Sequence, residues 1–145
     1  MNKLIYLVFF FGLVFWLRGN TIKSKVEVIK IEQKNLVNKK AQEYLFLDCM
    51  YSDSYFPTFL VDKCKDILLS LCVRIEDEKP SSLEALYVLT HASTNELNDL
   101  QNEFFENDSE IETGARECFG LDFEFIAKAY GFDADVEDLI ATREW

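Results

Sequence analysis

The sequence predicts an all-α fold, a compact bundle of about five helices preceded by a short hydrophobic N-terminal helix and a linker. Three observations support this prediction. From residue 39 onward, apolar residues recur with the 3.6-residue period of amphipathic helices. Proline, glycine, serine and aspartate stand at the ends of these periodic stretches, where helix boundaries favour them. The 145 residues are 49% hydrophobic and 28% charged, a composition typical of a folded protein.

The first 20 residues contain an unbroken apolar run, Leu4–Leu17, between Lys3 and Arg18. As a membrane helix these 14 residues would span about 21 Å of a hydrocarbon core roughly 30 Å thick. As a signal peptide the run has a suitable length, but no A-x-A-like cleavage site follows it. Three interpretations therefore stay open for residues 1–20: a membrane anchor, a signal peptide, or an extension upstream of the true start.

Basic residues are denser after this run than before it, which favours a cytoplasmic location for the C-terminal side. We expect a domain that is cytoplasmic or tethered to the inner membrane and facing the cytoplasm. Secretion or a periplasmic location through a signal peptide is the alternative. Membrane contact is expected through Leu4–Leu17 only. Residues 21–40 are interpreted as a basic linker, and residues 41–145 as the acidic helical domain.

The helices of this domain are predicted in order. A short first helix covers Ala41–Met50, and Pro57 opens the second at its first turn. Apolar residues of the second helix fall within a stripe about 140° wide. They are Leu60, Val61, Cys64, Ile67, Leu68, Leu71, Cys72 and Ile75. This helix is expected to end at Glu78 or Lys79, because Pro80 disfavours a helical conformation in the residue before it.

Two capping boxes predict the next helix starts. Ser81–Glu84 begins the third helix, which is expected to continue through Phe105. Ser109–Glu112 begins the fourth, which is expected to bend at Gly120 and to stop at Gly131, a favourable residue just beyond a helix end. A final short helix contains Val136, Leu139 and Ile140, and Asp133 is predicted to cap it.

The four cysteines, Cys49, Cys64, Cys72 and Cys118, show no CxxC or metal-finger spacing. Cys64 and Cys72 would lie roughly 12 Å apart along one helix, which is too far for a disulfide. We therefore expect buried free thiols, which suit a reducing compartment.

Charge is divided sharply along the chain. Residues 1–40 hold eight Lys/Arg and two Glu, a net charge of +6, whereas residues 41–145 hold seven basic and 24 acidic residues, a net charge of −17. Such a domain repels nucleic acids at long range and attracts basic surfaces. We expect no nucleic acid partner, and a basic protein is the partner that the charge favours.

The longest stretch without Lys or Arg, residues 80–115, contains eight carboxylates. Glu96, Asp99, Glu103 and Glu106 share one helix face, where like charges cost about 0.2–0.5 kcal/mol per pair. This acidic row is either a solvated face or a site for a basic partner or cation. Paired Glu-x-x-His motifs and the glycine of an EF-hand loop are absent from the sequence, so no metal site and no cofactor are expected.

Two further features are candidates for binding or chemistry. His91, the single histidine, is either a general base or a structural hydrogen-bonding residue, and no Ser or Cys nucleophile is assigned beside it. The loop Met50–Pro57 places Tyr51 and Tyr55 among small polar residues. It either forms a ligand pocket or plugs the bundle, with Asp53 closing an Asx-turn. No phosphate loop, nucleophile elbow or metalloprotease motif is present in the sequence, so no catalytic residue is assigned.

Three long stretches of the sequence resemble one family. They read YLFLDCMYSDSYFPTFLVDKCKDILLSLC, LYVLTHASTNELNDLQNEFFENDSEIETGARE and DFEFIAKAYGFDADVEDLIATREW. Over residues 44–145 the chain resembles a bacterial domain-of-unknown-function family, number 5713. The resemblance implies a short, soluble, single-domain protein that begins near Glu43, which gives weight to an extension or a lineage-specific anchor before it. It implies no activity, and no residue inherits a role from it.

The leading hypothesis is a non-enzymatic, acidic interaction protein that docks on a basic partner, as immunity proteins do on basic toxins. The alternative is a small enzyme or ligand-binding domain that uses the Tyr51–Pro57 loop with His91. A third possibility is a membrane-tethered accessory protein. The candidate binding residues are Tyr51, Asp53, Tyr55, His91, Glu96, Asp99, Glu103 and Glu106.

Overall fold

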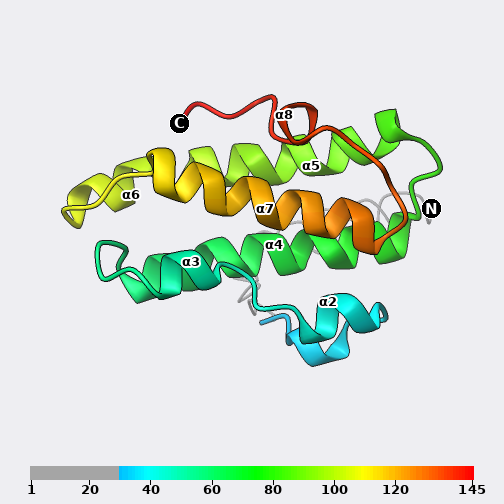
Figure 1. The fold of residues 1–145 in the computed structure, drawn as a ribbon, viewed down its shortest axis with the longest axis horizontal. Coiled ribbons are helices and arrows are strands. Elements are labelled where there is room, and N and C mark those ends of the chain that lie inside the picture. The colour runs from blue at the N-terminus through cyan, green and yellow to red at the C-terminus, as the bar shows by residue number, and fades with distance from the viewer. Residues whose placement is uncertain (1–29) are drawn as a thin grey trace, which may run out of the picture.

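A computed structural model describes residues 30–145, and this part of the chain is entirely helical, with no strand. Three long helices, α4 (Thr58–Glu78), α5 (Leu83–Asn98) and α7 (Thr113–Ala129), run along the length of the bundle (Figure 1). Shorter elements pack around them. They are the 3₁₀ helix η1 (Gln33–Asn35), α2 (Lys39–Glu43), α3 (Asp48–Tyr51), α6 (Gln101–Glu106) and α8 (Val136–Leu139). The prediction of an all-helical bundle is confirmed.

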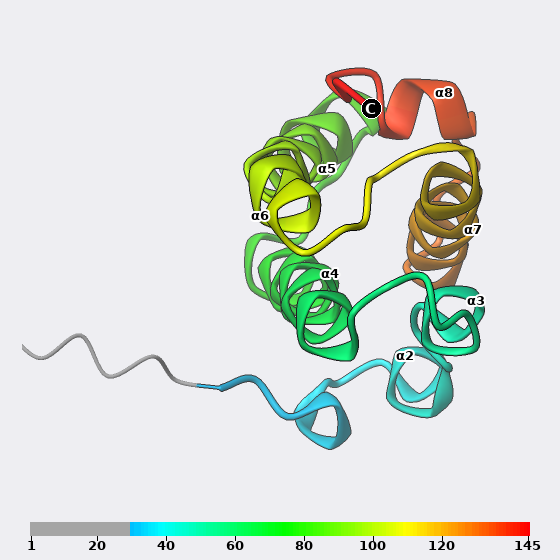
Figure 2. The ribbon, with the colours of Figure 1, turned by 90° about the vertical axis from the view of Figure 1, so that its left-hand side faces the viewer.

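Viewed end-on, α4 and α5 form one side of the bundle and α7 the other, with α3 below α7 and α8 above it (Figure 2). The core between them contains four completely enclosed aromatic rings, those of Phe46, Phe104, Phe119 and Phe123. The hydrophobic N-terminal segment, residues 1–20, lies outside the described residues, and so do residues 21–29 of the predicted linker. Within residues 30–145, no helix has the length and apolar character needed to cross a membrane.

The remainder of the predicted linker lies against the domain. Leu36 is buried, and the backbone N–H groups of Val37 and Asn38 donate to the carboxylate of Glu76 on α4. The side chain of Asn38 caps α2 by accepting from the N–H groups of Lys40 and Ala41. Residues 36–38 are therefore held by packing and hydrogen bonds.

The predicted first helix, Ala41–Met50, is divided in the structure. α2 ends at Glu43, and α3 begins at Asp48 after Leu47, whose φ of 57° is left-handed. This conformation is unfavourable for leucine, but Leu47 is fully buried and its N–H donates to the Asp122 carboxylate on α7. A contact with a distant helix therefore overrides the local helical pattern.

The second predicted helix corresponds to α4, and its end at Glu78 is confirmed. Seven of its eight predicted stripe residues are buried, and Ile67 is half-buried. The third predicted helix is divided into α5 and α6, with a break at Asp99–Leu100. Ser82 caps α5 by accepting from the N–H of Ala85, one residue later than the predicted capping box.

The predicted capping box at Ser109–Glu112 is wrong. Ser109 is buried, and α7 begins only at Thr113, with no side-chain cap from Glu112. The predicted end of this helix is confirmed, because Gly131 follows α7 with a φ of 89°, a value that glycine adopts without steric cost. Asp135, and not the predicted Asp133, caps α8 by accepting from the N–H of Glu137.

Cys49 on α3 and Cys118 on α7 form a disulfide, with their Cα atoms 6.1 Å apart. The expectation of four free thiols is therefore wrong for this pair, and the argument for a reducing compartment loses its basis. The two cysteines are 69 residues apart in sequence, and only the packing of α3 on α7 brings them together. Cys64 and Cys72 are free and buried, and burial raises the pKa of each thiol to about 12.

Gly120 allows α8 to approach α7 closely. A Cβ atom at this position would lie 3.2 Å from Cγ1 of Val136 on α8, and α7 continues through Gly120 as a single helix. Gly120→Val is therefore expected to lower the free energy of unfolding by about 1–2 kcal/mol through overpacking. Urea unfolding measures this, with Gly114→Val at the exposed start of α7 as the control. Equal effects of the two substitutions would contradict the close-packing explanation.

Candidate functional site

The predicted acidic row runs along α5 and α6 and faces cations of α4. Arg74 donates to Glu96 at 3.2 Å, and Lys63 forms an ion pair with Glu103. Two of the four carboxylates are therefore partnered within the chain, which offsets part of the like-charge repulsion. Asp99 and Glu106 are exposed, and neither belongs to any ion pair of the described residues.

The Tyr51–Pro57 loop connects α3 to α4 at one end of the bundle. The hydroxyl of Tyr51 donates to Asp62 on α4 at 2.7 Å, and Asp53 accepts from the N–H of Tyr55 at 2.9 Å, the geometry of an Asx-turn. Phe56 is buried, whereas Tyr55 remains 41% exposed. This arrangement resembles the expected plug, with one aromatic ring inside the bundle and another on its surface.

His91 lies in a different neighbourhood. Its Nε2 is 2.7 Å from the carbonyl oxygen of Asp138 on α8, and its ring stacks on that of Tyr87. The backbone carbonyl of His91 also accepts from the hydroxyl of Thr142. Among the described residues, none of the hydrogen bonds or ring contacts of His91 is with the Tyr51–Pro57 loop, so the structure does not bring the two together. These contacts favour a structural role for His91, in which it holds the C-terminal segment on α5.

One end of the bundle combines two connections that cross it. Residues 52–57 join α3 to α4, and residues 107–112 join α6 to α7 (Figure 2). Four exposed carboxylates follow one another here, and with Asp53 and Tyr55 they make up a surface that we call the acidic end. Its members are Asp53, Tyr55, Glu106, Asp108, Glu110 and Glu112.

The two connections are neighbours, since a Cβ atom at Gly114, just after the second connection, would lie 4.0 Å from Cζ of Phe56 in the first. Desolvation, followed by the negative charges of Glu112 and Glu110, raises the pKa of the Tyr55 hydroxyl. Among the described residues, none of the carboxylates of the acidic end takes part in an ion pair. Lys63, the first cation of α4, is engaged with Glu103. The acidic end is therefore a negative surface around a partly exposed tyrosine.

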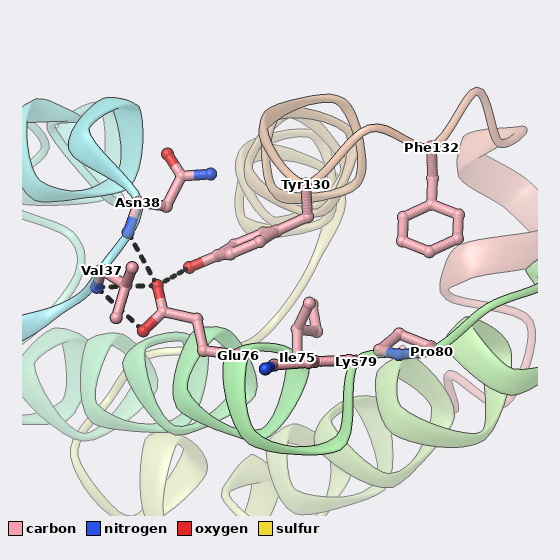
Figure 3. Close-up of a pocket in the computed structure, with 8 residues that line it drawn as sticks. All are labelled: Val37, Asn38, Ile75, Glu76, Lys79, Pro80, Tyr130 and Phe132. Carbon is pink, nitrogen blue, oxygen red and sulfur yellow. Dashed lines mark hydrogen bonds between the residues drawn. The ribbon is translucent and has the colours of Figure 1, made fainter.

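A pocket of about 520 Å³ lies at the opposite end of α4 (Figure 3). The eight residues around it come from residues 37–38, the last turn of α4 and the region that follows α7. They are Val37, Asn38, Ile75, Glu76, Lys79, Pro80, Tyr130 and Phe132. The sequence does not single out this pocket, because it joins three segments that are distant in the chain and form no contiguous motif.

The carboxylate of Glu76 is the polar centre of this pocket. Its Oε1 accepts from the N–H of Val37, the N–H of Asn38 and the hydroxyl of Tyr130, at 3.0, 2.9 and 2.6 Å. Its Oε2 accepts from the N–H of Val37 at 2.9 Å. Although burial opposes ionisation, these hydrogen bonds lower the pKa of Glu76. Glu76 is therefore an anion in a fixed orientation at neutral pH.

Asp122 on α7 is a second carboxylate that the sequence pattern does not indicate as a site residue, and it is 3% exposed. It accepts from the hydroxyl of Tyr44 at 2.9 Å and from the N–H of Leu47 at 2.8 Å. Burial raises its pKa to about 6, against the opposing effect of these two donors. Because it does not line the pocket around Glu76, we assign it the structural role of fixing the α2–α3 connection on α7.

The part of the chain that the structure describes contains no group of three or more His, Cys, Asp or Glu side chains placed to hold a metal ion. Its architecture and surface define a class: an acidic, all-helical bundle stabilised by one disulfide. The family model described as "Family of unknown function (DUF5713)" matches residues 40–145. The chain belongs to this family, as the resemblance indicated. Neither the curated proteins nor the solved structures include a match to it.

Proposed function

We propose that this protein is a non-enzymatic interaction module that docks its acidic end on a basic protein partner. The observation that carries the proposal is the set of exposed carboxylates of the acidic end, none of which is paired with a cation of the described residues. A tyrosine supplies contact area at low entropic cost. The surrounding charges steer a positive partner toward it and disfavour negative ones.

The neighbouring surface of α4 extends this face. Phe59 is 49% exposed, and it lies one helical turn before Lys63, which pairs with Glu103 on α6. Glu106 follows Glu103 by three residues, at the end of the same short helix. A partner with Arg or Lys side chains could therefore pair with carboxylates and contact aromatic rings at the same time, since cations stack favourably on such rings.

We propose that this domain lies in the cytoplasm, or at the inner membrane facing the cytoplasm, although a disulfide such as Cys49–Cys118 is more typical of oxidising compartments. The support is the excess of basic residues after Leu4–Leu17, which favours retention of the following segment on the cytoplasmic side.

The proposal is tested with the full-length chain immobilised and exposed to lysate of the cells that produce it. A protein retained at low salt is purified and titrated against two triple variants. Glu106→Gln/Glu110→Gln/Glu112→Gln neutralises the acidic end, and Glu43→Gln/Glu78→Gln/Asp133→Asn removes the same charge from exposed positions elsewhere. We expect the first variant to weaken binding by at least about tenfold, and the second by less than about threefold.

Salt dependence provides the second readout. Binding through exposed charges is expected to weaken as ionic strength rises, because screening acts on such contacts. Equal losses in the two triple variants would show that only net charge matters. Binding insensitive to salt, or failure to retain any basic protein, would contradict the proposal.

A further inference from the structure

We propose that the pocket at the C-terminal ends of α4 and α7 is a second binding site, and that its ligand is a small organic ammonium ion with an apolar body. Its charged centre is the Glu76 carboxylate, and its walls include the rings of Tyr130 and Phe132. This site is independent of the acidic end, from which it is separated by the length of α4 (Figure 1).

Glu76 retains capacity to bind a cation. An ionised carboxylate offers about four lone-pair positions on its two oxygens. Among the described residues, Oε1 accepts from three donors, but Oε2 accepts from one, the N–H of Val37. A ligand ammonium group could therefore donate to Oε2 without displacing a contact that holds residues 37–38. The existing hydrogen bonds also fix the carboxylate in advance, which lowers the entropic cost of binding.

Two helix ends reinforce the negative charge. α4 ends at Glu78, and α7 ends at Ala129, directly before Tyr130. The aligned backbone dipoles give the C-terminus of a helix up to about half a negative charge. At α7 this charge is reduced, because its last three carbonyl groups accept hydrogen bonds from Asn38, Gly131 and Phe132. A cation in this pocket would lie near both ends as well as Glu76, whereas an anion would be repelled by all three.

The remaining walls suit the body of the ligand. Ile75 and Pro80 are apolar, and Figure 3 shows the rings of Tyr130 and Phe132 on the side of the pocket opposite α4. Aromatic faces attract ammonium groups through their quadrupoles within about 6 Å. An aryl or alkyl chain attached to the ammonium group can pack on the same rings and aliphatic side chains.

One pocket residue opposes a cation. Lys79 is exposed at the rim, with a φ of 49°, and it belongs to no ion pair of the described residues. Its charge is outnumbered by those of Glu76, Asp77 and Glu78 in the same turn. Removing the Lys79 charge is therefore expected to tighten the binding of an ammonium ligand, which a nonspecific apolar site would not show.

The test uses 2-phenylethylamine, which is protonated at neutral pH, and the neutral analogue 2-phenylethanol, each titrated into the full-length chain by calorimetry and NMR. We expect saturable binding of the amine and at least tenfold weaker binding of the alcohol. Lys79→Gln is expected to tighten amine binding severalfold, whereas Lys65→Gln, the same change elsewhere on α4, is expected to have little effect. Phe132→Ala and Glu76→Gln are expected to weaken it at least fivefold.

The folded state of each variant is checked by its thermal unfolding transition, so that a loss of structure is not mistaken for a loss of binding. Lys79→Gln removes an exposed charge that makes no hydrogen bond within residues 30–145, so this variant keeps the test decisive if Glu76→Gln unfolds. Equal affinity for the amine and the alcohol, absence of saturable amine binding, or no tightening in Lys79→Gln would overturn the proposal.

Discussion

The double variant Cys49→Ser/Cys118→Ala is expected to have a free energy of unfolding about 4 kcal/mol lower than that of the oxidised protein. The disulfide joins residues 69 apart in sequence. Closing a loop of this length lowers the conformational entropy of the unfolded chain, which raises its free energy by about 4 kcal/mol. It also joins α3, a helix of only four residues, to α7. Such a short helix has little stability of its own, so it depends on this bond and on the burial of Met50.

Urea unfolding with and without reductant measures the effect. Reductant is expected to lower the stability of the parent protein to that of the double variant, and to leave the double variant unchanged. The control is Cys64→Ala, which removes a buried thiol but no cross-link and should preserve the response to reductant. Alkylation of the unfolded, oxidised protein should label two cysteines, and labelling of all four would contradict the bond.

The parts of the fold that the sequence predicts well depend on local information. α4 is the clearest example, since Pro57 and Pro80 bracket its apolar stripe and the helix occupies Thr58–Glu78. Prediction fails where a distant contact decides the conformation. Leu47 breaks the first predicted helix because Asp122, 75 residues away, accepts its N–H. Ser109 is buried where a helix cap was expected, so burial displaces the start of α7 to Thr113.

The same distinction applies to the candidate sites. The acidic row is visible from its spacing, but its partners Arg74 and Lys63 come from another helix and become apparent only when α4 packs beside α5 and α6. The neighbourhood of His91 was likewise unpredictable, because Asp138 is 47 residues away. Glu76 carries no local signal, since it is one of three consecutive acidic residues in α4 and only packing against Val37 and Tyr130 distinguishes it.

The second large effect concerns pH and Asp122. The pKa of this carboxyl is raised from 3.8 to about 6, chiefly because burial disfavours its ionised form. A raised pKa means that the folded state binds the proton more tightly than the unfolded state does. The stabilisation from this proton is therefore complete below a pH of about 3.8 and is lost as the pH rises through about 6.

Asp122→Asn removes this dependence, because an amide stays neutral and its oxygen can still accept from the N–H of Leu47. The free energy of unfolding of Asp122→Asn, relative to the parent protein, is therefore expected to rise by about 2 kcal/mol between pH 4 and pH 7. Urea unfolding at several pH values measures the difference, with the exposed Glu117→Gln on the same helix as the reference. Taking differences cancels the titration of the other carboxylates. A difference that stays flat or falls toward neutral pH would mean that the donors Tyr44 and Leu47 outweigh burial and keep Asp122 ionised, because an isosteric amide gains on the parent only where the buried carboxylate carries an uncompensated charge.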